Sequence, residues 1–128
     1  ITYWVTRAIK VGAARERPYV HFTSERGGED NLSFPSGHTS HAFALAASAG
    51  MIAHERGYKL EPYVWASGMT IATLTGYLRI AADRHYLTDV VVGASIGVSA
   101  GLTVPFLMRR TNAIVVPSGT GVAFVGEW

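Results

Sequence analysis

Three long apolar runs, separated by short polar connectors, form the main pattern of this chain. The runs cover residues 39–53, 62–78 and 90–108, and none contains Asp, Glu, Lys or Arg. Each run is longer than an ordinary strand, so the pattern predicts helices. Residues 54–61 and 79–89 are the connectors. We therefore expect an all-α helical bundle.

Each run also carries small residues at four-residue intervals, which places them along one face of a helix. The three trios are Ala42, Ala46 and Gly50; Gly68, Ala72 and Gly76; and Gly93, Gly97 and Gly101. Glycine inside a helix costs roughly 1 kcal/mol relative to alanine. Close packing of neighbouring backbones would offset that cost, so we expect these faces to lie between the helices.

Two segments outside the three runs differ from them in composition. Residues 23–33 are polar and rich in glycine, which predicts a loop. Residues 113–128 are rich in valine with Pro and Gly between, which predicts a short strand or an extended segment. We therefore divide the chain into a helical core over residues 1–110 and an extended C-terminal tail over residues 111–128.

Composition excludes several classes of protein. Hydrophobic residues make up 48% and charged residues 16% of the chain, which excludes a disordered tail. The net charge is only +2 and the basic residues form no stripe, so no nucleic-acid partner is expected. The absence of cysteine excludes disulfides, a thiolate nucleophile and cysteine-based zinc sites.

Residues that could carry chemistry gather in three clusters at the edges of the apolar runs. The clusters are Lys10 with Arg17-Pro18; Pro35-Ser36-Gly37-His38; and Arg79, His85 and Asp89. Taken singly, they are typical of surface charges, of a helix entrance and of an ion pair near a helix start. Taken together, they supply what phosphoryl transfer needs, because cations and N–H donors stabilise the charge while histidines attack and donate a proton.

Spacing within the clusters suggests how they meet a phosphate. If one helix continued through Lys10 and Arg17, the seven-residue interval would put both on one face, and Pro18 would end the helix. The start of a helix at Ser36 offers free N–H groups to an anion. His85 and Asp89 are four residues apart, so the carboxylate could orient the imidazole.

These clusters resemble the three-part signature of the type 2 phosphatidic acid phosphatase and vanadium haloperoxidase superfamily. The internal spacings agree, and the resemblance covers residues 1 to about 110. One departure is Leu78, where the family usually has Ser before the Arg. The resemblance implies a bundle of the phosphatidic acid phosphatase kind. The family's bundle has more helices than these residues provide, so we expect its N-terminal helices to be missing from the chain.

The resemblance also implies roles for the residues. His85 would be the nucleophile that forms a phosphohistidine, Asp89 would hold and polarise it, and His38 would be the general acid. The residues expected to bind the phosphate are Lys10, Arg17, Ser36, Gly37 and Arg79. His41 and Arg84 are secondary candidates, for the edge of the site and for a further phosphate contact, although surface positions are their ordinary interpretation.

The expected function is that of a metal-independent phosphatase acting on a phosphate monoester or diphosphate, and the substrate is expected to be a phosphorylated lipid or a small phosphate ester. Neither a metal nor another cofactor is expected, and vanadate is expected to inhibit. The alternatives are a vanadium-dependent haloperoxidase, with vanadate as cofactor, and a non-catalytic membrane relative. The identity of the substrate and the oligomeric state stay open.

The apolar runs also bear on location. Runs 62–78 and 90–108 have 17 and 19 residues, at the lower end of the roughly 17 to 25 residues of a membrane-spanning helix. A zigzag path puts the three clusters on one side and Arg109-Arg110 on the other, and positive charge prefers the cytoplasmic side. We therefore expect a cell membrane protein whose active site faces the periplasm. The many Ser, Thr, Gly and Ala residues leave a soluble periplasmic protein as the alternative.

Overall fold

The computed structural model describes residues 2–23, 27–111, 114–118 and 121–125, and it confirms the all-α prediction. The elements in chain order are α1 (Thr2–Ala13), the 3-10 turn η1 (Pro18–His21), α2 (Gly37–Glu55), α3 (Glu61–Ala81), α4 (Leu87–Thr111), β1 (Ile114–Ser118) and β2 (Gly121–Val125). The three apolar runs form α2, α3 and α4. The extended tail contains two short strands, which pair antiparallel.

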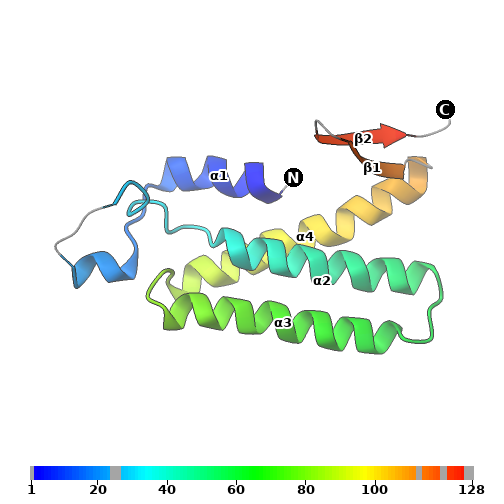
Figure 1. Ribbon diagram of the computed structural model, residues 1–128, viewed down its shortest axis with the longest axis horizontal. Helices are drawn as coiled ribbons and strands as arrows, with labels where there is room; N and C mark the ends of the chain where they lie inside the picture. Colours follow the sequence, from blue (N-terminus) through cyan, green and yellow to red (C-terminus); the bar gives the residue numbers. More distant parts are fainter. Residues whose placement is uncertain (1, 24–26, 112–113, 119–120, 126–128) are drawn as a thin grey trace.

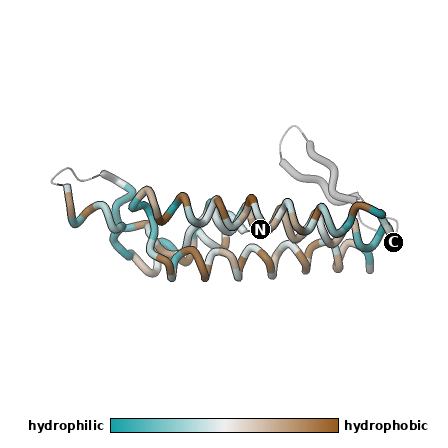
Figure 2. The backbone as a smooth tube through the Cα atoms, turned by 90° about the horizontal axis from the view of Figure 1, so that it is seen from below, coloured by the Kyte–Doolittle hydropathy of each residue, from teal (hydrophilic) through white to brown (hydrophobic). Residues whose placement is uncertain are grey.

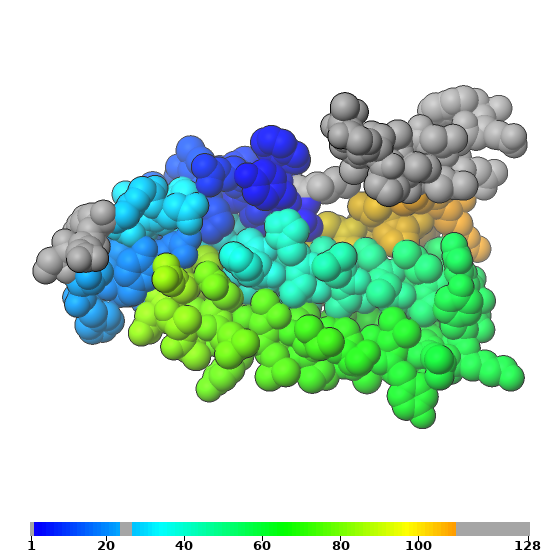
Figure 3. All heavy atoms as spheres, in the orientation of Figure 1, coloured from blue at the N-terminus to red at the C-terminus, as the bar shows by residue number. Residues whose placement is uncertain are grey.

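Helix α2 is the centre of the bundle. It packs against α4 and α3 along most of its length, and α1 lies beside its beginning (Figure 1). In the space-filling view the residues of α1 lie on one side of the start of α2, and the end of α3 lies on the other side at the same end of the molecule (Figure 3). The three segments that carry the predicted clusters therefore meet at one end of the molecule.

The glycines of α4 bring this helix against the backbone of α2. A Cβ atom built on Gly93, Gly97 or Gly101 would come within 3.0 Å of a carbonyl oxygen of α2. The three carbonyl groups belong to Ser36, Ser40 and Ala44. The expectation that small residues at four-residue spacing face a neighbouring helix is confirmed for this trio, because no side chain larger than hydrogen fits there.

Large apolar side chains lie mostly on the outside of the bundle. The buried apolar residues are small, chiefly Ala46, Ala47, Ala53 and Ala72. Exposed large ones include Ile71 and Leu74 on α3 and Phe106 and Leu107 on α4. Figure 2 shows hydrophobic residues along the helices and hydrophilic residues gathered toward the ends of the bundle. Among the described helices, α4 alone is long and apolar enough to cross a membrane, over Leu87–Arg109.

Candidate active site

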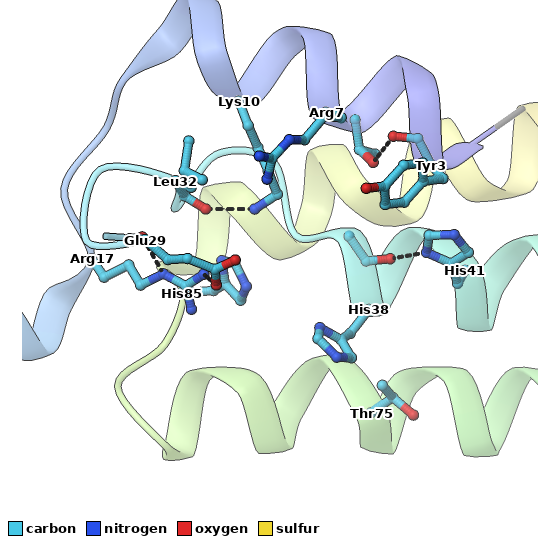
Figure 4. A pocket seen from close by; sticks show the side chains of 12 residues that line it. Tyr3, Arg7, Lys10, Arg17, Glu29, Leu32, His38, His41, Thr75 and His85 are labelled. Atoms are coloured by element: carbon cyan, nitrogen blue, oxygen red, sulfur yellow. Dashed lines mark hydrogen bonds and ion pairs between the residues drawn. The ribbon is translucent and has the colours of Figure 1, made fainter. Parts of the chain in front are cut away.

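A cavity of about 440 Å³ opens where α1 meets the first turn of α2. The residues that line it are Tyr3, Thr6, Arg7, Lys10, Arg17, Glu29, Leu32, Gly37, His38, His41, Thr75 and His85 (Figure 4). Five of the predicted site residues are among them, and they come from all three clusters. The fold thus collects around one space predicted site residues that are up to 75 positions apart, from Lys10 to His85.

His85 lies in the connector between α3 and α4 and is only 2% exposed. Its Nδ1 is 2.7 Å from the carbonyl oxygen of Ser33. A carbonyl can only accept, so Nδ1 carries the proton and Nε2 keeps a free lone pair. Burial, followed by the positive charge of Lys10, lowers the pKa of His85 to about 4. The imidazole is therefore neutral near pH 7, as a nucleophile requires.

Asp89 is fully buried in the first turn of α4. Its Oδ2 accepts hydrogen bonds from the Ser33 hydroxyl and from the Tyr86 backbone N–H, the latter at 2.9 Å. Its Oδ1 accepts one from Arg15 at 2.7 Å. The distance from Oδ2 to His85 Nδ1 is 3.7 Å, which is within ion-pair range but too long for a hydrogen bond. The carboxylate therefore reaches the imidazole chiefly through Ser33.

Ser33 and Arg15 hold this arrangement together, and the sequence analysis missed both. Ser33 contacts His85 with its carbonyl and Asp89 with its hydroxyl. Arg15 NH1 also donates to the Thr88 hydroxyl at 2.7 Å, and its guanidinium lies 4.1 Å from the centre of the Tyr86 ring. The contacts with Asp89 join positions 56 and 74 residues apart. No local spacing in the sequence could have indicated them.

Arg17 reaches the cavity by a path that the sequence analysis did not foresee. A helix running through Lys10 and Arg17 is wrong, because α1 ends at Ala13 and Ala14 takes a left-handed φ of 44°. Arg17 instead lies in extended backbone just before η1 and is 7% exposed. Its Nε donates to the Glu29 carbonyl at 3.1 Å, and its Nη2 is 3.4 Å from the Glu29 carboxylate. These bonds aim the guanidinium at the cavity (Figure 4).

Lys10 enters the cavity from the last turn of α1. Its ammonium group donates to the Leu32 carbonyl. Burial, followed by the positive charge of Arg17, lowers the pKa of Lys10 to about 8. Lys10 therefore keeps its charge at neutral pH and begins to lose it in mildly alkaline solution.

The second cluster forms the start of α2. Ser36 is the N-cap of the helix: its hydroxyl is 2.9 Å from the Thr39 hydroxyl and accepts from the Thr39 N–H at 3.5 Å. Ser36 is fully buried and does not line the cavity, so its part in phosphate binding stays a prediction. Gly37 and His38 do line it. Desolvation, followed by the positive charge of Arg79, lowers the pKa of His38.

Arg79 lies in the last turn of α3, outside the cavity lining. Its Nε is buried and, within the part of the chain that the structure describes, has no hydrogen-bond partner. Burial and the charges of Arg17 and Arg84 lower its pKa, which reflects how close these cations are. A buried N–H without a partner is rare in proteins, so the arrangement favours a ligand oxygen as the partner of Arg79.

The two secondary candidates, His41 and Arg84, differ in whether they line the cavity. His41 lines the cavity, with its Nδ1 2.6 Å from the Gly37 carbonyl. Arg84 does not line it, and its guanidinium lies 4.9 Å from the centre of the Tyr19 ring instead.

The charge around the cavity is suited to an anion. Arg7, Lys10 and Arg17 line it, and among the described residues Glu29, whose carboxylate is paired with Arg17, is the only acidic residue of the lining. Arg79 lies outside the lining but close enough to Arg17 for the two charges to interact. In a partly buried site such cations stabilise phosphate oxygens and the charge that develops during transfer. Among the described residues, no group of three or more His, Asp or Glu side chains could hold a metal ion.

Comparison with known proteins extends this description. The family model of the PAP2 superfamily matches residues 1–113. The lipid A 1-phosphatase of Porphyromonas gingivalis is 39% identical over 69 residues, which are 54% of this chain and 15% of that protein. A PA-phosphatase related-family protein of Dictyostelium discoideum is 29% identical over 120 residues, 84% of this chain and 44% of that protein. The chain thus spans less than half the length of either relative. No solved structure matches it significantly.

Proposed function

The chain belongs to the PAP2 superfamily, and from this we propose that it hydrolyses the phosphate ester of a phosphorylated lipid. The observation that carries the proposal is the cavity in which Lys10, Arg17, His38 and His85 meet. A lipid substrate is supported by the similarity to a lipid A 1-phosphatase and by the large apolar side chains exposed on α3 and α4. We call the space bordered by these four cavity residues the phosphate position.

The first step of the proposed reaction transfers the phosphoryl group to His85. Nε2 of the neutral imidazole attacks phosphorus, so a P–N bond forms while the bond from phosphorus to the ester oxygen breaks. His38 gives a proton to the leaving oxygen and becomes neutral. The positive charges of Lys10, Arg17 and Arg79 stabilise the equatorial oxygens.

The second step releases phosphate. His38 takes a proton from a water molecule as the water oxygen attacks phosphorus, and the P–N bond to His85 breaks. The sum is one water consumed for one alcohol and one inorganic phosphate, and both histidines return to their first state. The proton on Nδ1 of His85 stays hydrogen-bonded to the Ser33 carbonyl throughout, which keeps Nε2 as the reacting atom.

In this proposal the three cations provide the charge stabilisation that a metal ion provides in other phosphatases, so no metal cofactor takes part. Vanadate, which adopts five-coordinate geometry like the transition state, is proposed as an inhibitor that binds more tightly than phosphate.

We further propose that the bundle sits in a membrane with the phosphate position near its surface. Helix α4 meets the length and hydropathy of a spanning helix, and the cavity lies near its first residues, at the end opposite Arg109. Positive charge prefers the cytoplasmic side, which supports a cavity on the periplasmic side.

The central experiment is phosphate release by His85→Ala. We expect turnover to fall to background and a radiolabelled phosphoenzyme, trapped in acid in the wild type, to be missing from the variant. Asp89→Asn should remain active but slower, on the order of 100-fold or more, because the imidazole stays while the orienting charge is lost.

Two outcomes of the phosphate-release assay would contradict the proposal. Full activity of His85→Ala would exclude the histidine nucleophile. Loss of wild-type activity in EDTA, restored by a divalent cation, would exclude the metal-independent reaction. The exposed connector variant Arg56→Ala is the control for loss of a positive charge away from the cavity.

A further inference from the structure

The cavity contains a negative charge of its own. Among the described residues, Glu29 is the only acidic residue of the lining, which otherwise gathers cations that suit an anionic ligand. No step of the reaction proposed above uses this carboxylate. Like charges repel at short range, so a carboxylate that stayed beside the phosphate position would weaken the binding of the substrate.

The backbone of Glu29 is held in place independently of its side chain. The Glu29 carbonyl accepts from Nε of Arg17 at 3.1 Å and from the Leu32 N–H at 3.1 Å. The carbonyl of the next residue, Asp30, accepts from the Arg17 N–H at 2.8 Å. The loop therefore positions Arg17 through main-chain carbonyl groups, and the Glu29 carboxylate is not needed for that task.

The Glu29 carboxylate instead acts on the charges that the phosphate would use. Its Oε2 is 3.4 Å from Nη2 of Arg17. Burial and then Arg17 lower the pKa of Lys10, and the negative charge of Glu29 partly opposes this lowering. Figure 4 shows the Glu29 side chain pointing toward those of Arg17 and His85. The carboxylate is therefore directed at the phosphate position, to which it presents two anionic oxygens as a phosphate would.

The Glu29 side chain can leave this place at little cost. It is 72% exposed, whereas the side chain of Arg17 is 8% exposed. An ion pair with a solvent-exposed partner contributes little to stability, and 3.4 Å is long for a charge-assisted hydrogen bond. Rotation of the Glu29 side chain would return its carboxylate to water and free Nη2, while the main-chain contacts keep Arg17 where it is.

We infer that Glu29 is a built-in competitor of the phosphate: its carboxylate pairs with Arg17 when no phosphate is bound, moves into solvent when the substrate binds, and returns as inorganic phosphate leaves. This inference rests on the proposed phosphatase function and adds to it a role in product release. Several cations around one phosphate would otherwise retain the product. Substrate and product must each break the same ion pair, so both bind more weakly by the same factor.

The test measures the binding of inorganic phosphate to the protein in detergent micelles by isothermal titration calorimetry. Glu29→Gln removes the charge, and Glu29→Asp keeps the charge on a side chain that is one methylene group shorter. We expect both variants to bind phosphate about three- to fivefold more tightly than the wild type, because both lose the ion pair with Arg17. The inhibition constant of inorganic phosphate in the hydrolysis of decyl phosphate should fall by the same factor.

Glu61→Gln is the matched control, because Glu61 pairs with His54 at 2.9 Å at the opposite end of the bundle (Figure 1). This variant should bind phosphate as the wild type does. Unchanged or weaker binding by Glu29→Gln would overturn the inference, since the carboxylate would then support Arg17 instead of competing with the ligand.

Two further outcomes separate this inference from simpler explanations. Tighter binding by Glu29→Gln, with Glu29→Asp like the wild type, would also overturn it, because repulsion by a fixed charge explains that pattern without any displacement. Absence of decyl phosphate hydrolysis by the wild type would overturn the phosphatase function instead, and the calorimetric comparison would still decide whether Glu29 competes with phosphate.

Discussion

Asp89 shows how a single buried carboxylate joins separate parts of the site. Three donors reach its two oxygens: the Ser33 hydroxyl, the Tyr86 N–H and Arg15. A buried charge is costly unless it is paired and hydrogen-bonded, and these three donors supply that pairing. The Tyr86 bond is also one half of a capping box at the start of α4. The Asp89 side chain therefore both supports His85 and caps the start of α4.

Ser33→Ala tests whether the serine hydroxyl serves catalysis as well as stability. The change leaves the carbonyl that accepts from His85 but removes a donor from buried Asp89. We expect the free energy of unfolding to fall by about 1 to 3 kcal/mol and kcat to fall by roughly tenfold as Asp89 and the Ser33 backbone shift. Denaturant unfolding and steady-state kinetics measure the two effects.

Ser95→Ala is the matched control, because this exposed hydroxyl bonds only within its own helix. It should change stability by less than about 0.5 kcal/mol and leave kcat unaltered. A less stable Ser33→Ala with the kcat of the wild type would show that the Ser33 hydroxyl is structural only.

The pH dependence of kcat/KM follows from three groups of the free enzyme. His85 must be neutral, so activity should rise as pH passes its pKa of about 4. His38 must be protonated, and its pKa is lowered from 6.5. As pH rises, activity should therefore begin to fall before neutral pH is reached. Lys10 must be charged, so a further decline should follow near its pKa of about 8. The optimum is expected on the acid side of neutrality.

Lys10→Arg separates these effects. Arginine stays charged across the whole range, so the decline near pH 8 should vanish while the rise near pH 4 remains. An unchanged alkaline limb in this variant would assign that limb to another group.

At the scale of secondary structure, the pairing of α2 with α4 depends on glycine. Close contact with the α2 backbone leaves no room for a Cβ on α4. Because glycine is a poor helix former, these contacts are the physical reason for its presence in the longest helix.

Gly97→Ala should therefore destabilise the bundle. The added methyl group would meet the Ser40 carbonyl and the Phe43 side chain, and overpacking of this kind costs about 1 to 3 kcal/mol or more. Gly12→Ala is the control in α1, since nothing lies within 4 Å of a Cβ there. It should stabilise by up to about 1 kcal/mol. Thermal unfolding of both variants decides the matter, and equal effects would refute the packing argument.

The main helices and the motif residues of the site could be predicted from the sequence. The three uncharged runs became α2, α3 and α4 because their length and lack of charge leave few alternatives. The motif residues could be named because their spacing is local. The contacts of Ser33 and Arg15 could not, because they depend on the path that the chain takes between α1 and α2. That path begins with a left-handed turn at Ala14, which no residue type indicates.

For the whole molecule, the distribution of apolar side chains is the main finding. Alanine and glycine fill the interior, whereas isoleucine, leucine and phenylalanine lie outside on α3 and α4. Burial of apolar surface drives folding in water, so an exterior of this kind is better suited to lipid. In the proposed membrane arrangement, the hydrophilic ends of the bundle would lie at the two membrane surfaces (Figure 2).

Labelling of single cysteines tests the orientation, and the chain has no cysteine of its own to interfere. Gly28→Cys lies in the loop beside the cavity, with nothing within 4 Å of the new Cβ. Lys59→Cys lies exposed in the opposite connector, and it is preferable to Gly57→Cys because Gly57 has a φ of +61°. In intact cells an impermeant thiol reagent should label position 28 and not position 59. Equal labelling of both would favour a soluble periplasmic protein.

The evenly spaced glycines of α4 leave one property of the helix pair undecided, namely its lengthwise alignment. Gly93, Gly97 and Gly101 meet α2 carbonyls that are also four residues apart. A slip of one turn, about 5.4 Å, would set two of the three glycines on carbonyls again. The alignment is fixed at the end that holds the candidate site, where the Ser36 N–H donates to the Asp89 carbonyl at 2.9 Å and the Ser33 hydroxyl donates to the Asp89 side chain. Helix α4 therefore cannot slide without breaking the contacts of Asp89 with Ser33 and Ser36, so the candidate site also fixes the lengthwise alignment of the bundle.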